Sequence, residues 1–180
     1  MNKSDIAKQI YEAAHLTGTF TLRSGQVSHE YFDKYLFEAE PALLKAIAEC
    51  MLPLIPPQTQ VLAGLEIGGI PVVTALSLES GLPAAFVRKK AKEYGTCKLA
   101  EGQELSGQRV CVVEDVVTTG GQIVESIREL RARGAQVDTV LCVIQRNPAA
   151  TGILAGEGLR LIPAFTMAYI QAAVQPAAGG

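Results

Sequence analysis

The sequence predicts an α/β fold in which a mainly parallel sheet is flanked by helices. Apolar runs typical of buried strands alternate with helical segments from residue 60 onward. Two of those helical segments end at glycines, Gly81 and Gly134, as helices commonly do. The chain has 180 residues and shows no repeat or linker, which suits one domain. Alternation of strands and helices implies right-handed crossovers and a sheet covered on both faces.

The N-terminal part predicts two helices separated by an irregular segment. Apolar residues recur at helical spacing over 4–16, behind polar residues that can cap a helix. Residues 20–37 are rich in aromatic and charged side chains without a clear period, so an irregular segment is expected there. Pro41 opens the second helix, at a position where helices tolerate proline, and the prolines of 53–57 end it.

The remainder predicts the strands and helices of the main sheet. Residues 90–107 are polar and weakly periodic, which indicates a long mobile loop, and the tail, 172–180, is expected to be disordered. The strands are expected at 60–66, 83–89, 109–115, 137–146 and 159–166, and the helices at 71–80, 121–134 and, for a short one, near 149–157.

Charge and composition narrow the classes of function and binding partner that the sequence supports. The net charge of −2 gives no global signal for nucleic acid or an anionic membrane. No signal peptide is recognisable, and no apolar run reaches the roughly 18 residues of a membrane span. The four cysteines form no C-x-x-C pair, and the two histidines lie outside any Cys/His cluster, so a structural zinc site is not expected. A reducing cytoplasm is the expected compartment.

The stretch VVEDVVTTGG, residues 112–121, lies between a strand and a helix. Exposed backbone N–H groups at a helix start attract phosphate, and the glycines would let a ligand approach the backbone. The sequence is neither a Walker A loop nor G-x-G-x-x-G. Taken alone, Thr118, Thr119, Gly120 and Gly121 could equally form an ordinary connection with threonine caps.

The two acids of this stretch, Glu114 and Asp115, indicate a ligand that carries other polar groups besides an anionic one. Carboxylates beside a phosphate would repel it unless sugar hydroxyls or a hydrated Mg²⁺ intervene. An unpaired buried acid pair would also be costly. The predicted ligand is therefore a phosphorylated sugar, with its phosphate on the turn and its hydroxyls on the carboxylates.

Other stretches could complete such a site, each with a simpler alternative. Tyr31 and Phe32 could flank a planar ring or merely fill the core. The glycines of 64–76 could form an anion-binding turn or allow tight packing of strand on helix. Arg146, at a strand end, could bind a carboxylate or be a solvated terminus. Arg88, Lys89, Lys90, Lys92 and Lys98 could form a lid over a diphosphate, a solvated loop or, less favourably, a nucleic-acid patch.

VVEDVVTTGG resembles the phosphoribosyl-diphosphate motif of the type I phosphoribosyltransferases. The stretches FTLRSGQVSHEYFDKY and RKKAKEYGT resemble those of the family's orotate branch, and the likeness covers about 4–168. This resemblance implies the type I phosphoribosyltransferase fold, with an N-terminal hood over about 1–40 and a mobile catalytic loop over about 90–107. It implies transfer of ribose 5-phosphate from phosphoribosyl diphosphate to orotate, giving orotidine 5′-monophosphate in pyrimidine biosynthesis. Phosphoribosyl transfer to another base, or a non-catalytic sensor of the sugar diphosphate, are the alternatives.

The resemblance also assigns roles to residues. Mg²⁺ would be held mainly through the diphosphate and water, near Glu114 and Asp115, and a homodimer would share the catalytic loop between subunits. Tyr94 stands where many relatives have histidine, and tyrosine is a poor proton shuttle near neutral pH. The catalytic set is Arg88, Lys89, Lys92, Tyr94 and Asp115; the orotate set is Tyr31, Phe32, Thr118 and Arg146; and the sugar-diphosphate set is Arg23, Gly68, Gly69, Arg88, Lys89, Lys92, Glu114, Asp115, Val116, Val117, Thr118, Thr119, Gly120, Gly121 and Gln122.

Overall fold

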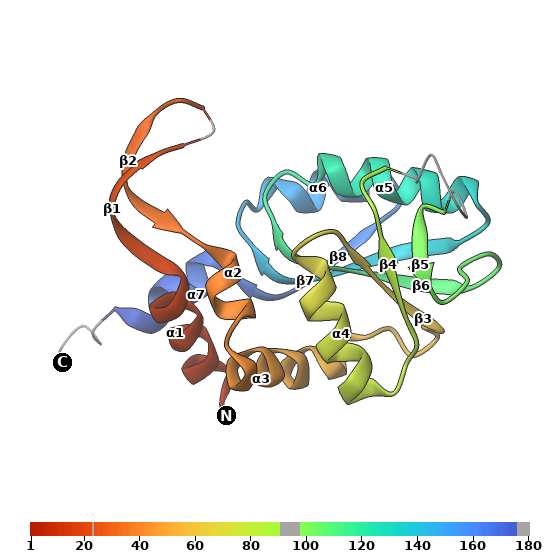
Figure 1. The fold of residues 1–180 in the computed structure, drawn as a ribbon, viewed down its shortest axis with the longest axis horizontal. Coiled ribbons are helices and arrows are strands. Elements are labelled where there is room, and N and C mark those ends of the chain that lie inside the picture. The colour runs from red at the N-terminus through yellow and green to blue at the C-terminus, as the bar shows by residue number, and fades with distance from the viewer. Residues whose placement is uncertain (23, 91–97, 176–180) are drawn as a thin grey trace.

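A computed structural model describes residues 1–22, 24–90 and 98–175 (Figure 1). The N-terminal elements are α1 (Lys3–Ala14), β1 (His15–Thr21), β2 (Val27–Phe32), α2 (Lys34–Glu38), α3 (Pro41–Met51) and a 3₁₀ turn (Leu52–Leu54). The elements that follow are β3 (Val61–Leu65), α4 (Gly69–Ser80), β4 (Ala84–Val87), β5 (Ala100–Gly102), β6 (Arg109–Val117), α5 (Gly121–Ala132), β7 (Gln136–Gln145), α6 (Ala149–Ala155), β8 (Arg160–Thr166) and α7 (Met167–Val174).

The main sheet has the strand order β5-β4-β3-β6-β7-β8. All its neighbouring strands pair in parallel except β5, which runs antiparallel to β4 at one edge. Helices cover both faces, with α5 and α6 on one side and α4 with the N-terminal helices on the other (Figure 1). The predicted α/β fold with a mainly parallel, helix-flanked sheet is confirmed.

Burial on both faces explains the composition of the central strands. Every residue of β3 is buried, and β7 is buried at all but two positions. Leu62 and Val113 pack toward the side of α4, whereas Ala63 and Val112 pack toward the side of α5. Continuous apolar runs are what a doubly covered parallel sheet requires, which is why these strands could be recognised in the sequence.

The N-terminal prediction of an irregular segment over 20–37 was wrong. β1 and β2 form an antiparallel hairpin that extends away from the main sheet in Figure 1, and α2 follows it, capped by the Asp33 side chain. Most hairpin residues are exposed on both sides of the two strands, so the sequence carries no alternation of apolar and polar residues.

Three further boundaries differ from the sequence predictions. Residues 100–102 form the edge strand β5, although a loop was expected over 90–107; 91–97 lie outside the described residues. β6 continues to Val117, two residues beyond the expected end. α7 extends to Val174, so the predicted disorder from 172 was wrong for the first residues of the tail, and 176–180 lie outside the described residues.

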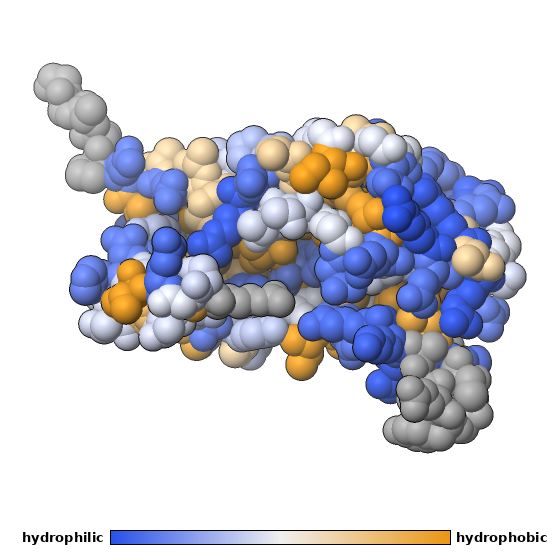
Figure 2. Space-filling view, turned by 90° about the horizontal axis from the view of Figure 1, so that it is seen from above, coloured by the Kyte–Doolittle hydropathy of each residue, from blue (hydrophilic) through white to orange (hydrophobic). Residues whose placement is uncertain are grey.

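The face of the molecule seen in Figure 2 shows few concentrated apolar regions. In Figure 2, which views the molecule from above, the coloured hydrophobic residues form small separate groups among hydrophilic ones. Large exposed hydrophobic side chains are spread along the chain, for example Val27 in β2, Ile67 in the β3–α4 turn and Leu78 in α4. In the described part of the chain, none of the helices is long and apolar enough to span a membrane.

Candidate active site

The turns after β3 and β6 meet at one edge of the sheet. At this point the direction in which successive strands are added to the sheet reverses. From β3 the chain crosses through α4 to β4 on one side, whereas β6, β7 and β8 follow on the other side. In open α/β sheets, ligands bind beyond the carboxyl ends of the strands at such a switch point. The motif VVEDVVTTGG therefore lies at the place where the fold itself favours a ligand.

The β6–α5 turn has the geometry of an anion-binding site. Thr118 and Thr119 are exposed, and α5 begins at Gly121 without a side-chain cap on its first N–H groups. Gly120 has φ 83°, a left-handed conformation that favours glycine, and Leu154 packs where a side chain would project. Gln122 is exposed in the first turn of α5, with its Nε2 3.4 Å from Glu125 Oε2. The uncapped N–H groups are available to a phosphate.

The β3–α4 turn is closely packed against β6. A Cβ at Gly69 would lie 2.6 Å from the Val113 carbonyl oxygen, and a Cβ at Gly68 would overlap the Asp115 carboxylate. Both glycines are buried. These short distances support the interpretation that Gly68 and Gly69 allow tight packing of strand on helix. Gly68 also brings the β3–α4 turn against Asp115 of the acid pair.

The two acids project from β6 into different surroundings. Asp115 is completely buried and Glu114 is partly exposed. Lys34, from α2, places its Nζ 2.6 Å from Asp115 Oδ2, and the Val116 N–H donates to Asp115 Oδ1 at 2.5 Å. Lys34 belongs to the recognised YFDKY stretch, but sequence reasoning did not include it in the site, since nothing local indicates its partner 81 positions later.

Glu38, on the last turn of α2, is a second residue that sequence reasoning missed. Its side chain is buried, and Asp115 is among the groups that act on it electrostatically. Burial, followed by the hydrogen bond and charge of Asp115, raises the pKa of Glu38 to about 9. Burial and the Asp115 charge likewise raise the pKa of Glu114 to about 8. Burial alone would lower the pKa of Lys34, but its contact with Asp115 outweighs this and raises it.

The predicted lid cations are only partly described. Arg88 and Lys89 follow β4: Arg88 Nε lies 3.6 Å from Glu101 Oε1, and the Lys89 N–H donates to Glu66 Oε1 at 2.5 Å. Both residues therefore lie at the carboxyl edge of the sheet, beside the β3–α4 turn. Arg23, Lys92, Tyr94 and Cys97 lie outside the described residues.

Three of the residues predicted to bind the base line one cavity of about 330 Å³. Tyr31 and Phe32 reach it from β2, and Arg146 reaches it from the end of β7. Thr118, the fourth predicted base contact, is not among the residues that line this cavity. Its neighbour in the chain, Val117, nevertheless lies beside the cavity residue Arg146, because the Arg146 N–H donates to the Val117 carbonyl at 2.8 Å. An aromatic wall and an exposed guanidinium suit a planar ring that carries a carboxylate.

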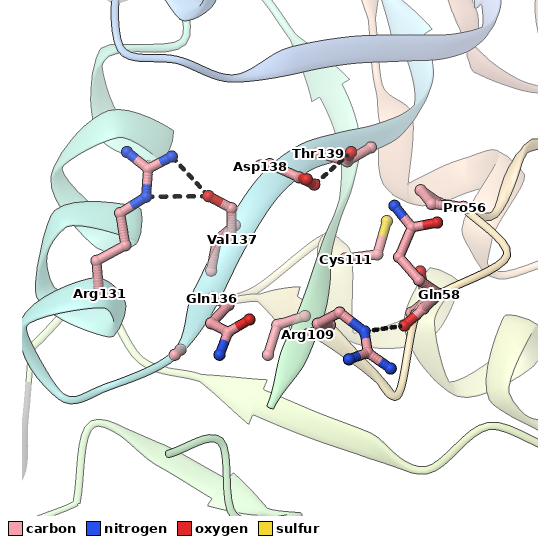
Figure 3. Close-up of a pocket in the computed structure, with 12 residues that line it drawn as sticks. Pro56, Gln58, Arg109, Cys111, Arg131, Gln136, Val137, Asp138 and Thr139 are labelled. Atoms are coloured by element: carbon pink, nitrogen blue, oxygen red, sulfur yellow. Dashed lines mark hydrogen bonds between the residues drawn. The ribbon is translucent and has the colours of Figure 1, made fainter. Parts of the chain in front are cut away.

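A further cavity of about 360 Å³ lies at the opposite, amino-terminal edge of β6 and β7 (Figure 3). Its arginines already have protein partners: Arg131 donates from Nε and Nη2 to the Val137 carbonyl, and Arg109 Nε donates to the Gln58 carbonyl at 2.8 Å. These contacts hold α5 and the segment before β3 to the strands. The geometry therefore favours the carboxyl edge as the active site.

Comparison with known proteins identifies the family. The sequence model of the phosphoribosyl transferase domain matches residues 37–152. An orotate phosphoribosyltransferase of Nocardioides sp. is 54% identical over 168 residues, which are 93% of this chain and 94% of the relative. One from Methanocella arvoryzae is 45% identical, with 80% and 82% covered. The chain belongs to the orotate phosphoribosyltransferase family.

Solved structures of orotate phosphoribosyltransferases share the fold. The Mycobacterium tuberculosis enzyme in complex with inorganic phosphate is 29% identical with a TM-score of 0.84, covering 94% of this chain and 98% of that one. The same enzyme in complex with 5-phospho-α-D-ribosyl 1-diphosphate has a TM-score of 0.80 at 28% identity, with 94% and 98% covered. The family's fold thus accounts for nearly the whole chain.

Proposed function

We propose that this chain transfers ribose 5-phosphate from phosphoribosyl diphosphate to orotate, giving orotidine 5′-monophosphate and diphosphate. The observation that carries the proposal is the placement of Tyr31, Phe32 and Arg146 around one cavity at the sheet edge that also carries the β6–α5 turn. An orotate ring would lie against the aromatic side chains, and its carboxylate would pair with the Arg146 guanidinium. Membership of the orotate phosphoribosyltransferase family supports the same reaction.

In this proposal the donor lies across the switch point. Its 5′-phosphate binds the N–H groups and hydroxyls of 118–121, and partly exposed Glu114 accepts from the ribose hydroxyls. Asp115 lies behind Lys34, whose side chain is 33% exposed while that of Asp115 is 1% exposed. Direct contact between Asp115 and a hydroxyl therefore requires the Lys34 ammonium to move aside.

The reaction breaks the bond between C1 and the diphosphate and forms a bond between C1 and the orotate nitrogen, whose proton passes to the departing diphosphate or to water. Positive charge develops on the ribose as the diphosphate leaves, and the nearby carboxylates offset it. Arg88 and Lys89, with Lys92 and Tyr94 of the predicted loop, would stabilise the departing diphosphate. Closure of that loop would exclude water, which would otherwise hydrolyse the activated sugar.

Mg²⁺ fits this site as an ion held mainly by the substrate. Among the described residues, no group of three or more His, Cys, Asp or Glu side chains is arranged to hold a metal. The Asp115 carboxylate is already paired with Lys34. Glu114 remains as an oxygen donor to a hydrated ion, since Mg²⁺ commonly keeps several waters and binds substrate phosphates. When bound, the ion would neutralise charge on the diphosphate.

A homodimer and a cytoplasmic location complete the proposal. The family resemblance implies that the catalytic loop, near 90–107, reaches the neighbouring subunit's site. Sedimentation at micromolar concentration tests the dimer. Cys111 and Cys142 are buried free thiols, a state compatible with a reducing compartment.

The decisive experiment follows orotate absorbance after addition of the protein to orotate, phosphoribosyl diphosphate and Mg²⁺. A fall that requires both substrates, with orotidine monophosphate as product, is the expected result. If orotate is inert, a panel of purine and pyrimidine bases under the same conditions tests transfer to another base. If no base of the panel is converted while the protein still binds the sugar diphosphate, a non-catalytic sensor is favoured.

A further inference from the structure

Glu66 is the first residue after β3, at the point where the chain leaves the sheet for the β3–α4 turn. Its backbone N–H donates to the Val87 carbonyl of β4 at 2.8 Å, so the pairing of the two strands extends to this residue. Its carboxylate accepts from the Lys89 N–H at 2.5 Å. Glu66 therefore holds the backbone of the β4 end on both sides of Arg88.

The carboxylate of Glu66 takes the place of a backbone acceptor. In a regular parallel ladder, a residue that donates to one position of the neighbouring strand accepts, through its own carbonyl, from the position two residues later. Because Glu66 donates to Val87, its carbonyl would be the regular acceptor for the Lys89 N–H. In this structure that N–H donates to the Glu66 side chain. Lys89 thus keeps an acceptor from the β3 side although the β3 backbone has already turned toward α4.

The opposite side of the β4 end is held by β5, which is the other neighbour of β4 in the sheet (Figure 1). The Arg88 N–H donates to the Leu99 carbonyl at 2.9 Å, and Arg88 Nε lies 3.6 Å from Glu101 Oε1. The contact from Glu66 differs from these two because it comes from the β3–α4 turn. That turn packs against Asp115 of the donor site.

The position of this backbone decides where two cationic side chains begin. Arg88 is half-buried and lines a cavity of about 380 Å³ together with Glu66, Ile67 and Phe86, whereas Lys89 is exposed. A shift of the backbone at the end of β4 moves the Cα atoms of both cations. Long side chains enlarge such a shift at their charged ends, so the backbone contacts control where the charges lie.

We propose that Glu66 is a positioning residue for Arg88 and Lys89: its carboxylate continues the β3–β4 pairing past the end of β3 and so directs the two cations toward the leaving diphosphate. This inference rests on the proposed function, which assigns these cations to that diphosphate. Glu66 acts through the backbone and does not touch the substrate. A carboxylate beside a polyanion is unfavourable by charge alone, and the hydrogen bond from the Lys89 N–H accounts for its presence there.

A matched pair of variants tests the acceptor. Glu66→Gln keeps a side-chain carbonyl that can accept from the Lys89 N–H, whereas Glu66→Leu keeps approximately the same volume and has no acceptor. Affinity for inorganic diphosphate with Mg²⁺, measured by calorimetry, should stay within about threefold of wild type in Glu66→Gln. In Glu66→Leu it should fall by about tenfold or more, because small displacements of binding groups are costly.

Ribose 5-phosphate is the control ligand, because it carries the phosphate for the β6–α5 turn and lacks the diphosphate. Its affinity should be the same in wild type and in both variants. Glu104→Leu is the control variant. Glu104 Oε1 also accepts from backbone N–H groups, those of Leu105 at 3.1 Å and Ser106 at 3.3 Å. It lies near the beginning of β4, where the Gln103 N–H donates to the Ala84 carbonyl, so its loss should change neither affinity by more than about twofold.

Amide hydrogen exchange at Lys89 gives a second readout, which needs no ligand. Loss of the acceptor should make the Lys89 N–H exchange about tenfold faster in Glu66→Leu, and Glu66→Gln should keep the slow exchange of wild type. Faster exchange, together with a loss of affinity confined to diphosphate, supports the proposal.

Equal diphosphate affinity in the Gln and Leu variants, or an equal loss of ribose 5-phosphate affinity in Glu66→Leu, overturns it. All these measurements omit orotate. Absence of orotate turnover in the wild type would therefore refute the proposed function, while the diphosphate affinities still decide the role of Glu66.

Discussion

Lys34 Nζ lies 2.6 Å from Asp115 Oδ2 and thereby joins α2, near the N-terminus, to the carboxyl end of the central strand β6. The two side chains differ in exposure, 33% for Lys34 and 1% for Asp115. This ion pair directly links the N-terminal segment to the acid pair of the recognised motif. Because Lys34 belongs to α2, which follows the hairpin, the position of these two elements affects the charge environment of Asp115 in the donor site.

Removal of the Lys34 ammonium should destabilise the protein. Lys34→Ala leaves the buried Asp115 carboxylate without its cation, and we expect a loss of about 1–3 kcal/mol, less than for a fully buried pair because Lys34 is partly exposed. Urea unfolding at pH 7 measures the change. The matched control is Lys45→Ala, whose ammonium lies 3.8 Å from Glu49 and Glu79 at exposed positions and should contribute less than about 1 kcal/mol. Equal effects of the two substitutions would show that the Lys34 pair contributes no more than a surface contact.

A side chain at Gly68 should damage the donor site. The Cβ of Gly68→Ala would overlap the Asp115 carboxylate, so either that carboxylate or the β3–α4 turn must shift. We expect affinity for the sugar diphosphate to fall by about tenfold or more, as measured by calorimetry with Mg²⁺ present. Gly152→Ala, in α6, is the control: its Cβ would meet no atom within 4 Å, and the helix should gain about 0.5–1 kcal/mol. Unchanged affinity in Gly68→Ala would separate this turn from donor binding.

The motif and the main sheet could be predicted from the sequence because their signals are local. Strands buried on both faces read as apolar runs, and the pair of acids before the glycine-containing turn of 112–121 distinguishes that turn from an ordinary connection. The hairpin β1–β2 could not be recognised, because its mostly exposed strands lack alternation. Lys34 and Glu38 were missed for a different reason. Asp115, which forms an ion pair with Lys34, lies far away in sequence, and only the fold brings α2 beside the end of β6.

Arg146 should determine binding of the base. Arg146→Ala removes the guanidinium from the cavity lined by Tyr31 and Phe32, and KM for orotate should rise by about tenfold to a hundredfold. Affinity for the sugar diphosphate should stay close to wild type, because the β6–α5 turn is a separate part of the site. Arg146→Lys should recover only part of the loss, since an ammonium lacks the planar fork of the guanidinium. Parallel loss of both substrates would remove Arg146 from a specific role in base recognition.

Binding of the sugar diphosphate should release a proton from Glu114 near neutral pH. Burial and the charge of Asp115 raise the pKa of Glu114 to about 8, so at pH 7 this carboxyl is largely protonated in the free protein. Accepting hydrogen bonds from ribose hydroxyls favours the ionised form and lowers that pKa. Because the bound state holds fewer protons, affinity should increase as pH rises from about 6 toward 8. Calorimetry at pH 7 in two buffers of different ionisation enthalpy measures the number of protons released. Glu114→Gln is the control, since the phosphate groups of the ligand titrate equally in both proteins and only the wild type has the Glu114 proton to release. The same proton count in both proteins would show that Glu114 does not change its ionisation on binding.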